Sequence, residues 1–300
     1  MAVTEYDVVV VGSGPAGLQA AIHASRRRLR VLILGRADRS HAYREHIDNL
    51  YGVQDAAGSD LVLIGRQQAE QAGAVFLEED AVRLDRTDAR FVIETESGLA
   101  MRTKSIVLAT GAAVPESGVT GETEYVGRGV SYCVDCDAPF FQGKPVAVVG
   151  GGSAAIEGAL TLAAVATEVH LIAPKVEVTE ALQARLESSG VIRHVPDELS
   201  AIVGGDGVEA VATKRGRRIP VEGVFIEPAG RGALELSLPL GLRLDPDAVG
   251  FVVTDEKQAT NVPGMFAAGD VTGRPWQVAR AIGQGCVAGI EAARYAQSVS

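Results

Sequence analysis

The sequence predicts an α/β protein, in which parallel strands alternate with helices, and it predicts two halves that begin alike. Residues 6–17 read YDVVVVGSGPAG, and residues 145–155 read PVAVVGGGSAA. Each stretch joins an apolar strand to a glycine-rich turn and then to a helix of small residues. The chain has 300 residues, of which 47% are hydrophobic, so it suits one large domain or two of medium size.

The first turn contains Gly12, Gly14 and Gly17, and the helical stretch LQAAIHAS follows it. In such a turn the first glycine permits a tight bend, the second lets the backbone approach a pyrophosphate, and the third allows close helix–strand packing. The phosphates then lie at the positive end of the helix. Gly150 and Gly152 repeat the pattern, so we expect two dinucleotide-binding turns, although each copy alone also suits a purely structural turn.

Three further apolar stretches are expected to be strands of the first half. RVLILG ends at Gly35 and Arg36, where the usual acidic residue for a ribose is absent and Arg36 could meet a phosphate instead. KSIVLATGA (104–112) is a buried strand that ends in a turn. GMFAAGDVTG (264–273) is a short strand closed by Gly269 and Asp270, and this aspartate suits a ribityl hydroxyl or the cap of a following helix.

Charge and hydropathy exclude several classes of function. The formal net charge is −10, and the run SRRRLR at 25–30 is expected to be the solvated end of a helix, so no nucleic-acid partner is expected. No apolar run approaches the ~20 residues that cross a bilayer. The first residues are expected to enter a strand at once, so we expect no signal peptide. We therefore expect a cytoplasmic protein with no membrane partner.

The segment SYCVDCDAPFF (131–141) contains two of the three cysteines, Cys133 and Cys136, followed by Asp137. Two cysteines spaced by two residues can close a small disulfide ring. The stretch CDAPFFQGK could open a short helix, and a helix N-terminus beside a thiol favours its reactive thiolate form. A structural zinc site needs about four ligands, and the chain has one such pair, so we expect a redox pair and no metal. Cys286 is expected to be a packed thiol.

Five motifs together resemble the low-molecular-weight thioredoxin reductases over nearly the full chain. They are GSGPAG at 12–17, ATGA at 109–112, GRGVSYCVDCD at 127–137, VVGGGSAAIEGAL at 148–160 and FAAGDVTGRPWQVARAIGQGCVAG at 266–289. The resemblance implies two Rossmann-like, three-layer domains. One is an FAD-binding domain of residues 1–114 and 246–300, and the other is an inserted NAD(P)-type domain, residues 115–245, with the CxxC motif. It also implies a homodimer and a thioredoxin-like protein substrate.

Carried over position by position, the resemblance implies an FAD site and a redox-active dithiol. Cys136 would face the flavin, Cys133 would attack the disulfide of the protein substrate, and Asp137 would carry protons to and from the thiols. Trp276 stands where relatives have arginine, and it would lie against the flavin, cover it, or be an ordinary packed aromatic. The residues expected to bind the cofactor are Gly12, Ser13, Gly14, Pro15, Ala16, Gly17, Gly35, Arg36, Asn49, Val82, Ala109, Thr110, Gly111, Gly269, Asp270, Trp276, Gln277 and Val278.

The match to this family fails in two places. After the strand EVHLI, relatives carry a His-Arg-Arg motif that grips the 2′-phosphate of NADPH, whereas this chain reads APKVEVTE, with Lys175 as its only cation. A Gly-Gly-Gln segment along the flavin is replaced by ADRSHAYREHIDN (37–49). We expect this segment to be a surface loop, with a contact from His41 or Tyr43 to the flavin as the alternative.

These departures resemble the branch of thioredoxin reductase-like flavoproteins that do not use NADPH. We therefore expect an FAD-dependent disulfide oxidoreductase whose donor is not NADPH, with ferredoxin as the first candidate. NADH needs no 2′-phosphate clamp and stays open. Three alternatives remain: a dithiol oxidase in which oxygen re-oxidises the flavin, an orthodox NADPH–thioredoxin reductase, and a flavin-loaded sensor without turnover.

Overall fold

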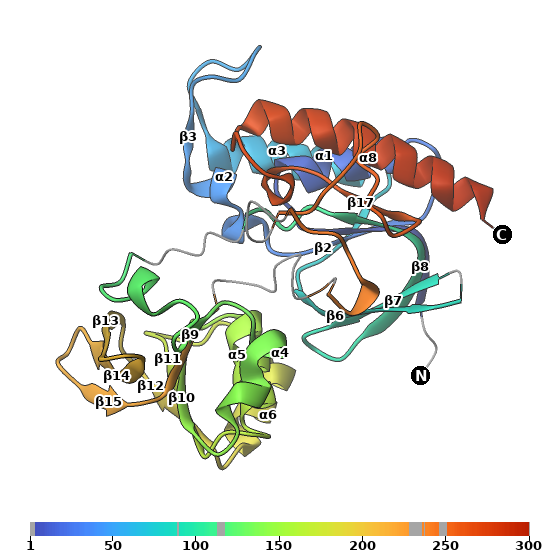
Figure 1. Cartoon of the computed structure of the whole chain (residues 1–300). Helices are drawn as coiled ribbons and strands as arrows, with labels where there is room; N and C mark the ends of the chain where they lie inside the picture. The colour runs from blue at the N-terminus through green and yellow to red at the C-terminus, as the bar shows by residue number, and fades with distance from the viewer. Residues whose placement is uncertain are drawn as a thin grey trace. The chain divides into compact units, whose positions relative to one another are not determined.

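The computed structural model describes residues 4–88, 90–112, 118–227, 236, 238–245 and 251–299. The chain divides into two compact units: unit 1 consists of Met1–Ala113 and Gly232–Ser300, and unit 2 of Val114–Arg231. Figure 1 shows unit 1 built from both ends of the chain. Each unit has a parallel sheet with helices, which confirms the predicted α/β fold class of two Rossmann-like domains. The domain boundaries predicted near residues 114 and 246 lie outside the described residues and stay predictions.

Unit 1 is built on a seven-stranded sheet in the order β5-β2-β1-β8-β7-β6, with β17 paired to β8 beside this path. The strands β5, β2, β1, β8 and β17 are parallel, whereas β6 and β7 form an antiparallel hairpin joined to the first half of β8. The apolar run at 8–11 is buried at the end of β1, as its hydrophobicity predicts. The strands are β1 Thr4–Val11, β2 Val31–Leu34, β5 Val75–Leu77, β6 Ala81–Thr87, β7 Arg90–Thr95, β8 Ala100–Leu108 and β17 Met265–Ala267.

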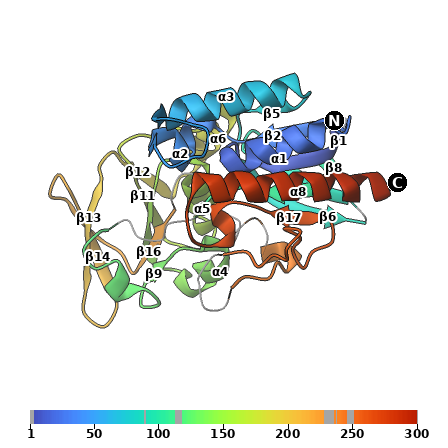
Figure 2. The same cartoon turned by 90° about the horizontal axis from the view of Figure 1, so that it is seen from above.

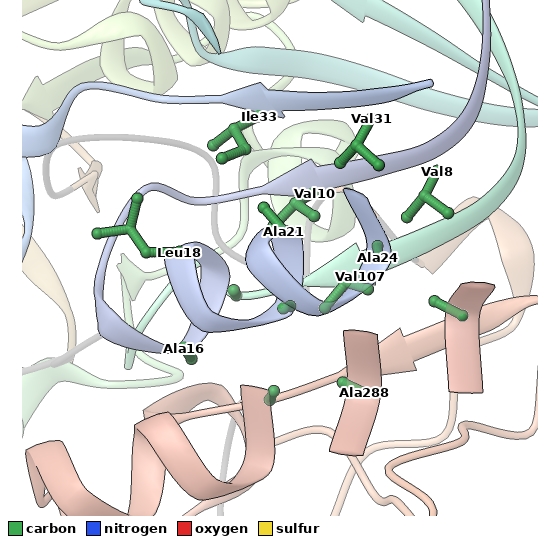
Figure 3. Packing of buried hydrophobic residues seen from close by; sticks show 14 of the residues in the cluster. Val8, Val10, Ala16, Leu18, Ala21, Ala24, Val31, Ile33, Val107 and Ala288 are labelled. Atoms are coloured by element: carbon green, nitrogen blue, oxygen red, sulfur yellow. The ribbon is translucent and has the colours of Figure 1, made fainter. Parts of the chain in front are cut away.

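The helices α1, α3 and α8 cover one face of this sheet, as the view in Figure 2 shows. α1 and α8 come from opposite ends of the chain and lie side by side. Figure 3 shows Val8 and Val10 of β1 packed near Ala21 and Ala24 of α1, with Ala288 of α8 in the same cluster. The remaining elements of unit 1 are α1 Pro15–Ser25, η1 Ala37–Arg39, α2 His41–Arg44, β3 His46–Ile47, β4 Ala56–Ala57, α3 Gly58–Gln71, η4 Leu238–Leu240, η5 Asp270–Thr272 and α8 Val278–Ser298.

Unit 2 has a five-stranded parallel sheet in the order β12-β11-β10-β16-β9, and a separate antiparallel sheet of β13, β14 and β15. The apolar strand β10 lies in the middle of the parallel sheet, and α5 follows it directly, as the second glycine motif predicts. The elements are η2 Thr123–Tyr125, β9 Val130–Ser131, α4 Val134–Asp137, η3 Ala138–Phe141, β10 Pro145–Val149, α5 Ser153–Leu162, β11 Glu168–Ile172, α6 Glu180–Ser188, β12 Ile192–Val195, β13 Leu199–Gly204, β14 Val208–Thr213, β15 Arg218–Pro220 and β16 Gly223–Ile226.

Candidate active site

The first glycine turn brings backbone groups to the start of α1. Gly12 has φ +116°, and a Cβ at this position would meet the carbonyl oxygen of Ala109 at 2.1 Å. A Cβ on Gly17 would meet the carbonyl oxygen of Gly12 at 1.9 Å, so neither position has room for a side chain. α1 begins at Pro15 after Gly14, with no side-chain cap and no acidic residue in its first turn. Its first amide groups therefore suit an anion such as a pyrophosphate.

Other predicted cofactor residues converge on this turn from neighbouring strand ends. Ser13 is buried, and its Oγ lies 3.4 Å from the place of a Cβ on Gly35, after β2. A Cβ on Gly269, after β17, would lie 2.9 Å from the Cβ of Ala16. Because β2, β1, β8 and β17 are parallel neighbours, their carboxyl ends meet at one edge of the sheet, where α/β proteins bind ligands.

Among the buried polar side-chain atoms of unit 1 that have no hydrogen-bond partner in the described residues, two uncharged ones belong to predicted cofactor residues that flank the sheet edge. They are the hydroxyl Oγ1 of Thr110, which follows β8, and the indole Nε1 of Trp276, which precedes α8. A buried polar group without a partner costs about 1–3 kcal/mol, so each atom suits a bound molecule that completes its hydrogen bonding. The Arg274 guanidinium lies 4.2 Å from the centroid of the Trp276 ring.

Asp270 is the first residue of η5, and Gly269 rather than Asp270 is the N-cap of that turn. The alternative in which the Asp270 side chain caps a helix is therefore wrong. Burial raises the pKa of Asp270, and the positive charges of Arg280 on α8 and His41 on α2 oppose this rise. The segment that we expected to be a surface loop thus contains a short helix, and one of its side chains acts electrostatically on Asp270.

The start of α8 is tied to a distant part of unit 1. Asn49 Nδ2 donates a hydrogen bond of 3.1 Å to Gln277 Oε1, across 228 positions of the sequence. Gln277 is the N-cap of α8, and Val278 is its first residue. Val82 is buried at an irregularity of the β6–β7 ladder. The structure therefore brings Asn49 and Gln277 together, whereas no described contact joins Val82 to them.

Arg36 is engaged by carboxylates rather than left open for a phosphate. Its guanidinium hydrogen bonds to Glu96 and lies 3.2 Å from Asp80. The Glu96 side chain is fully buried; burial raises the pKa of Glu96, and the Arg36 guanidinium opposes this rise. The sequence reasoning did not single out Glu96, although an acidic residue directly after the alternating strand RFVIET was a signal. Contact between Arg36 and a phosphate stays a prediction.

The CxxC motif of unit 2 forms a disulfide between Cys133 and Cys136, with Cα atoms 5.4 Å apart. Cys133 is buried, Cys136 is exposed, and Asp137 is partly exposed. α4 begins at Val134, between the cysteines, so the expectation of a helix opened by CDAPFFQGK was about two residues late. Cys133 is its N-cap, and the Cys133 sulfur accepts a hydrogen bond from the Cys136 amide at 3.2 Å.

Ser131 fixes the turn between β9 and the disulfide. The Cys133 amide donates to Ser131 Oγ at 3.1 Å, and the same hydroxyl donates to the Cys133 carbonyl at 3.3 Å. Ser131 is buried. The sequence reasoning did not include this serine, although a hydroxyl residue two positions before an N-cap is a common local hydrogen-bonding signal.

The second glycine turn lies under a loop that carries little positive charge. A Cβ on Gly151 would meet the carbonyl oxygen of Lys175 at 2.1 Å, and the Glu177 amide donates to the Gly151 carbonyl at 2.8 Å. The Lys175 ammonium forms an ion pair with Glu177. Glu227 is buried beside the same turn, with its carbonyl oxygen 2.1 Å from the place of a Cβ on Gly150. The only cation of APKVEVTE is therefore paired with a carboxylate of the same loop.

The part of the chain that the structure describes holds neither a metal-ligand cluster nor a membrane-spanning helix. No cluster of three or more histidine, cysteine or acidic side chains could hold a metal ion in the part of the chain that the structure describes. Within the same residues, no helix combines the length and apolar character needed to cross a bilayer.

The sequence and the fold of this chain are similar to those of known disulfide oxidoreductases. The family model described as pyridine nucleotide-disulphide oxidoreductase matches residues 6–285. A thioredoxin reductase from Peptoclostridium litorale is 30% identical, and the match covers 98% of both chains. Several other relatives are longer, and the chain spans 57 or 58% of their length.

Two solved structures are similar over nearly their whole length. The atypical thioredoxin reductase TRi from Desulfovibrio vulgaris Hildenborough is 32% identical, with a TM-score of 0.81 and coverage of 97% of this chain and 98% of that one. A ferredoxin-flavin thioredoxin reductase from Clostridium acetobutylicum is 29% identical, with a TM-score of 0.72 and coverage of 99% and 100%.

Proposed function

The chain belongs to the pyridine nucleotide-disulphide oxidoreductase family, and on that premise we propose that it is a thioredoxin reductase-like flavoenzyme with a donor other than NADPH. It binds FAD in unit 1 and reduces a thioredoxin-like protein through Cys133 and Cys136. The observation that supports this most strongly is the Cys133–Cys136 disulfide, which joins a buried cysteine to an exposed one directly before Asp137.

The residues of unit 1 fit FAD. The amides at the start of α1 suit its pyrophosphate, and Asp270 suits a ribityl hydroxyl. The Thr110 hydroxyl and the Trp276 indole N–H, both buried without a described partner, suit polar atoms of the same molecule. When bound, FAD supplies a two-electron carrier between the donor and the disulfide.

The dithiol cycle follows from the two cysteines. Reduction of the Cys133–Cys136 bond takes up two electrons and two protons and yields two thiols, with Asp137 as the proton carrier. The Cys133 thiolate then attacks a disulfide of the protein substrate and forms a mixed disulfide. Cys136 attacks the Cys133 sulfur of that bond, the substrate leaves as a dithiol, and the enzyme disulfide re-forms. Because Cys133 is buried in the oxidised form, it must become accessible after reduction.

A protein substrate is supported by the surface beside Cys136. Phe140 is 72% exposed and lies four positions after this cysteine, on η3. An exposed aromatic side chain that follows the CxxC motif so closely in sequence suits an apolar contact with a folded protein partner. We extend the proposal to a homodimer on the strength of the family alone, and sedimentation of the purified protein tests that part.

The loop over the second glycine turn supports a donor other than NADPH. Recognition of a 2′-phosphate uses cationic side chains that make charge-assisted hydrogen bonds. Lys175 is instead paired with Glu177, and Glu227 is buried beside the turn. Ferredoxin is the first donor to test, because a ferredoxin-flavin thioredoxin reductase is among the similar structures.

The test is anaerobic reduction of the purified flavoprotein by NADPH, NADH and reduced ferredoxin in separate experiments, followed at the oxidised flavin band. We expect reduced ferredoxin to bleach the band and then to reduce added thioredoxin, while NADPH at micromolar concentration does not bleach it. Fast bleaching by NADPH would identify an orthodox thioredoxin reductase. Oxygen consumption with a small dithiol, and none of these reductions, would identify a dithiol oxidase.

A further inference from the structure

Arg280 on the first turn of α8 grips the loop that follows β17. Its guanidinium donates to the carbonyl oxygen of Gly273 at 2.6 Å and to the Thr272 hydroxyl at 2.9 Å. Longer contacts reach the carbonyl oxygens of Thr272 at 3.4 Å and Gly269 at 3.5 Å. One cationic side chain therefore spans the loop from its first residue to its last, which a single-point contact could not do.

Gln284, one helical turn further along α8, holds the same loop through a second set of hydrogen bonds. Its Oε1 accepts a hydrogen bond from the Gly269 amide at 2.9 Å and another from the Thr272 hydroxyl at 3.1 Å. Residues four positions apart lie on the same face of a helix. The face of α8 that carries Arg280 and Gln284 is therefore a two-residue clamp for residues 269–273.

The clamped loop carries Asp270, whose carboxyl makes none of the hydrogen bonds just described. Burial raises the pKa of Asp270, and the two charges that oppose the rise are Arg280 from α8 and His41 from α2. The His41 side chain is exposed on the four-residue helix α2, whereas Arg280 is fixed by its bonds to the loop. Arg280 thus acts on Asp270 in two ways: its hydrogen bonds fix the backbone of the loop that carries Asp270, and its positive charge lowers the pKa of the carboxyl.

We propose that Arg280 is a positioning residue of the flavin site, which holds the Asp270 loop in place and supplies Asp270 with a fixed positive charge. This inference rests on the proposed function, because it takes FAD as the ligand of Asp270. The contribution of the hydrogen bonds to the loop and the contribution of the positive charge can be separated by two substitutions. Arg280→Lys keeps the charge and loses the forked hydrogen bonds, whereas Arg280→Met leaves an unbranched apolar side chain and loses both.

The experiment measures the dissociation constant of FAD from the full-length apoprotein between pH 5 and pH 8. In the unsubstituted protein, affinity falls as pH falls through the pKa of Asp270, because the ionised carboxylate is the acceptor. Arg280→Met is expected to weaken FAD binding at least about tenfold and to move the midpoint of this fall to higher pH. Arg280→Lys is expected to weaken binding similarly while the midpoint stays near that of the unsubstituted protein.

Arg294→Met is the matched control, because Arg294 lies on the same helix but is exposed and pairs with Glu291. It should leave both the affinity and the midpoint unchanged. If Arg280→Met and Arg280→Lys both bind FAD as this control does, the inference is wrong while the proposed function stands. If the unsubstituted protein does not bind FAD, the proposed function itself fails. If Arg280→Met does not fold, the FAD affinity of Arg280→Lys, compared with that of Arg294→Met, still tests the inference.

Discussion

The packing of α8 on α1 gives a prediction that two glycines of one helix can test. Gly285 is buried, and a Cβ at this position would lie 2.2 Å from the carbonyl oxygen of Ala16 on α1. Real Cβ contacts shorter than 3.0 Å are essentially never seen, and the obstructing atom is backbone. The Gly285→Ala variant can therefore fold only if the two helices separate. Overpacking of this kind costs about 1–3 kcal/mol of unfolding free energy.

Gly283, two positions earlier on the same helix, is the matched control. It is exposed, and a Cβ there would meet no atom within 4 Å. Gly283→Ala should therefore stabilise the protein by about 0.5–1 kcal/mol, because alanine loses less backbone entropy in a helix. The two variants add the same methyl group to the same helix, so the sign of the effect depends on the contact with α1 alone.

Urea unfolding of both variants, followed by circular dichroism, measures the two free energies. The same samples should differ in bound flavin, because separation of α8 from α1 displaces Ala16 beside the first glycine turn. Equal stability of Gly285→Ala and Gly283→Ala would refute the close α1–α8 contact. Loss of stability in both would show that the effect arises within the helix.

Three further predictions follow from other contacts. Trp276 is the only tryptophan, so FAD should quench most of the apoprotein's tryptophan fluorescence, and unchanged emission would remove Trp276 from the flavin site. Glu96→Ala should lower the unfolding free energy by about 3 kcal/mol in urea titrations, because Arg36 then loses its buried partner; a neutral effect would mean that Asp80 alone suffices. Glu177→Arg should tighten NADPH binding about tenfold in calorimetry without a matching gain for NADH, and equal gains would argue against 2′-phosphate recognition.

The local parts of the site could be predicted from the sequence. The turns at Gly12 and Gly150 follow from short patterns, because a strand, a glycine turn and a helix in succession leave little conformational choice. The CxxC pair was predicted as a redox pair for a similar reason, since its two sulfurs are within reach in any compact turn. The start of α4 was misplaced because Cys133 itself caps the helix through its sulfur, an uncommon N-cap.

The contacts between distant segments could not be predicted in this way. Glu96 reaches Arg36 across 60 positions, and Asn49 reaches Gln277 across 228 positions. Such pairs depend on which strand ends and helices become neighbours, and a single sequence does not give that order. The resemblance supplied Asn49 and Gln277 as separate cofactor residues, but it gave no reason to expect a bond between them.

The most direct test of a flavin coupled to the Cys133–Cys136 disulfide is an anaerobic dithionite titration of the flavoprotein. The comparison is with the Cys133→Ser/Cys136→Ser double variant. The unsubstituted protein should take up about twice the reducing equivalents of the variant per bound flavin, since the disulfide adds a second two-electron step. If both proteins take up the same amount, the disulfide does not exchange electrons with the flavin, and the proposed reductase activity is wrong.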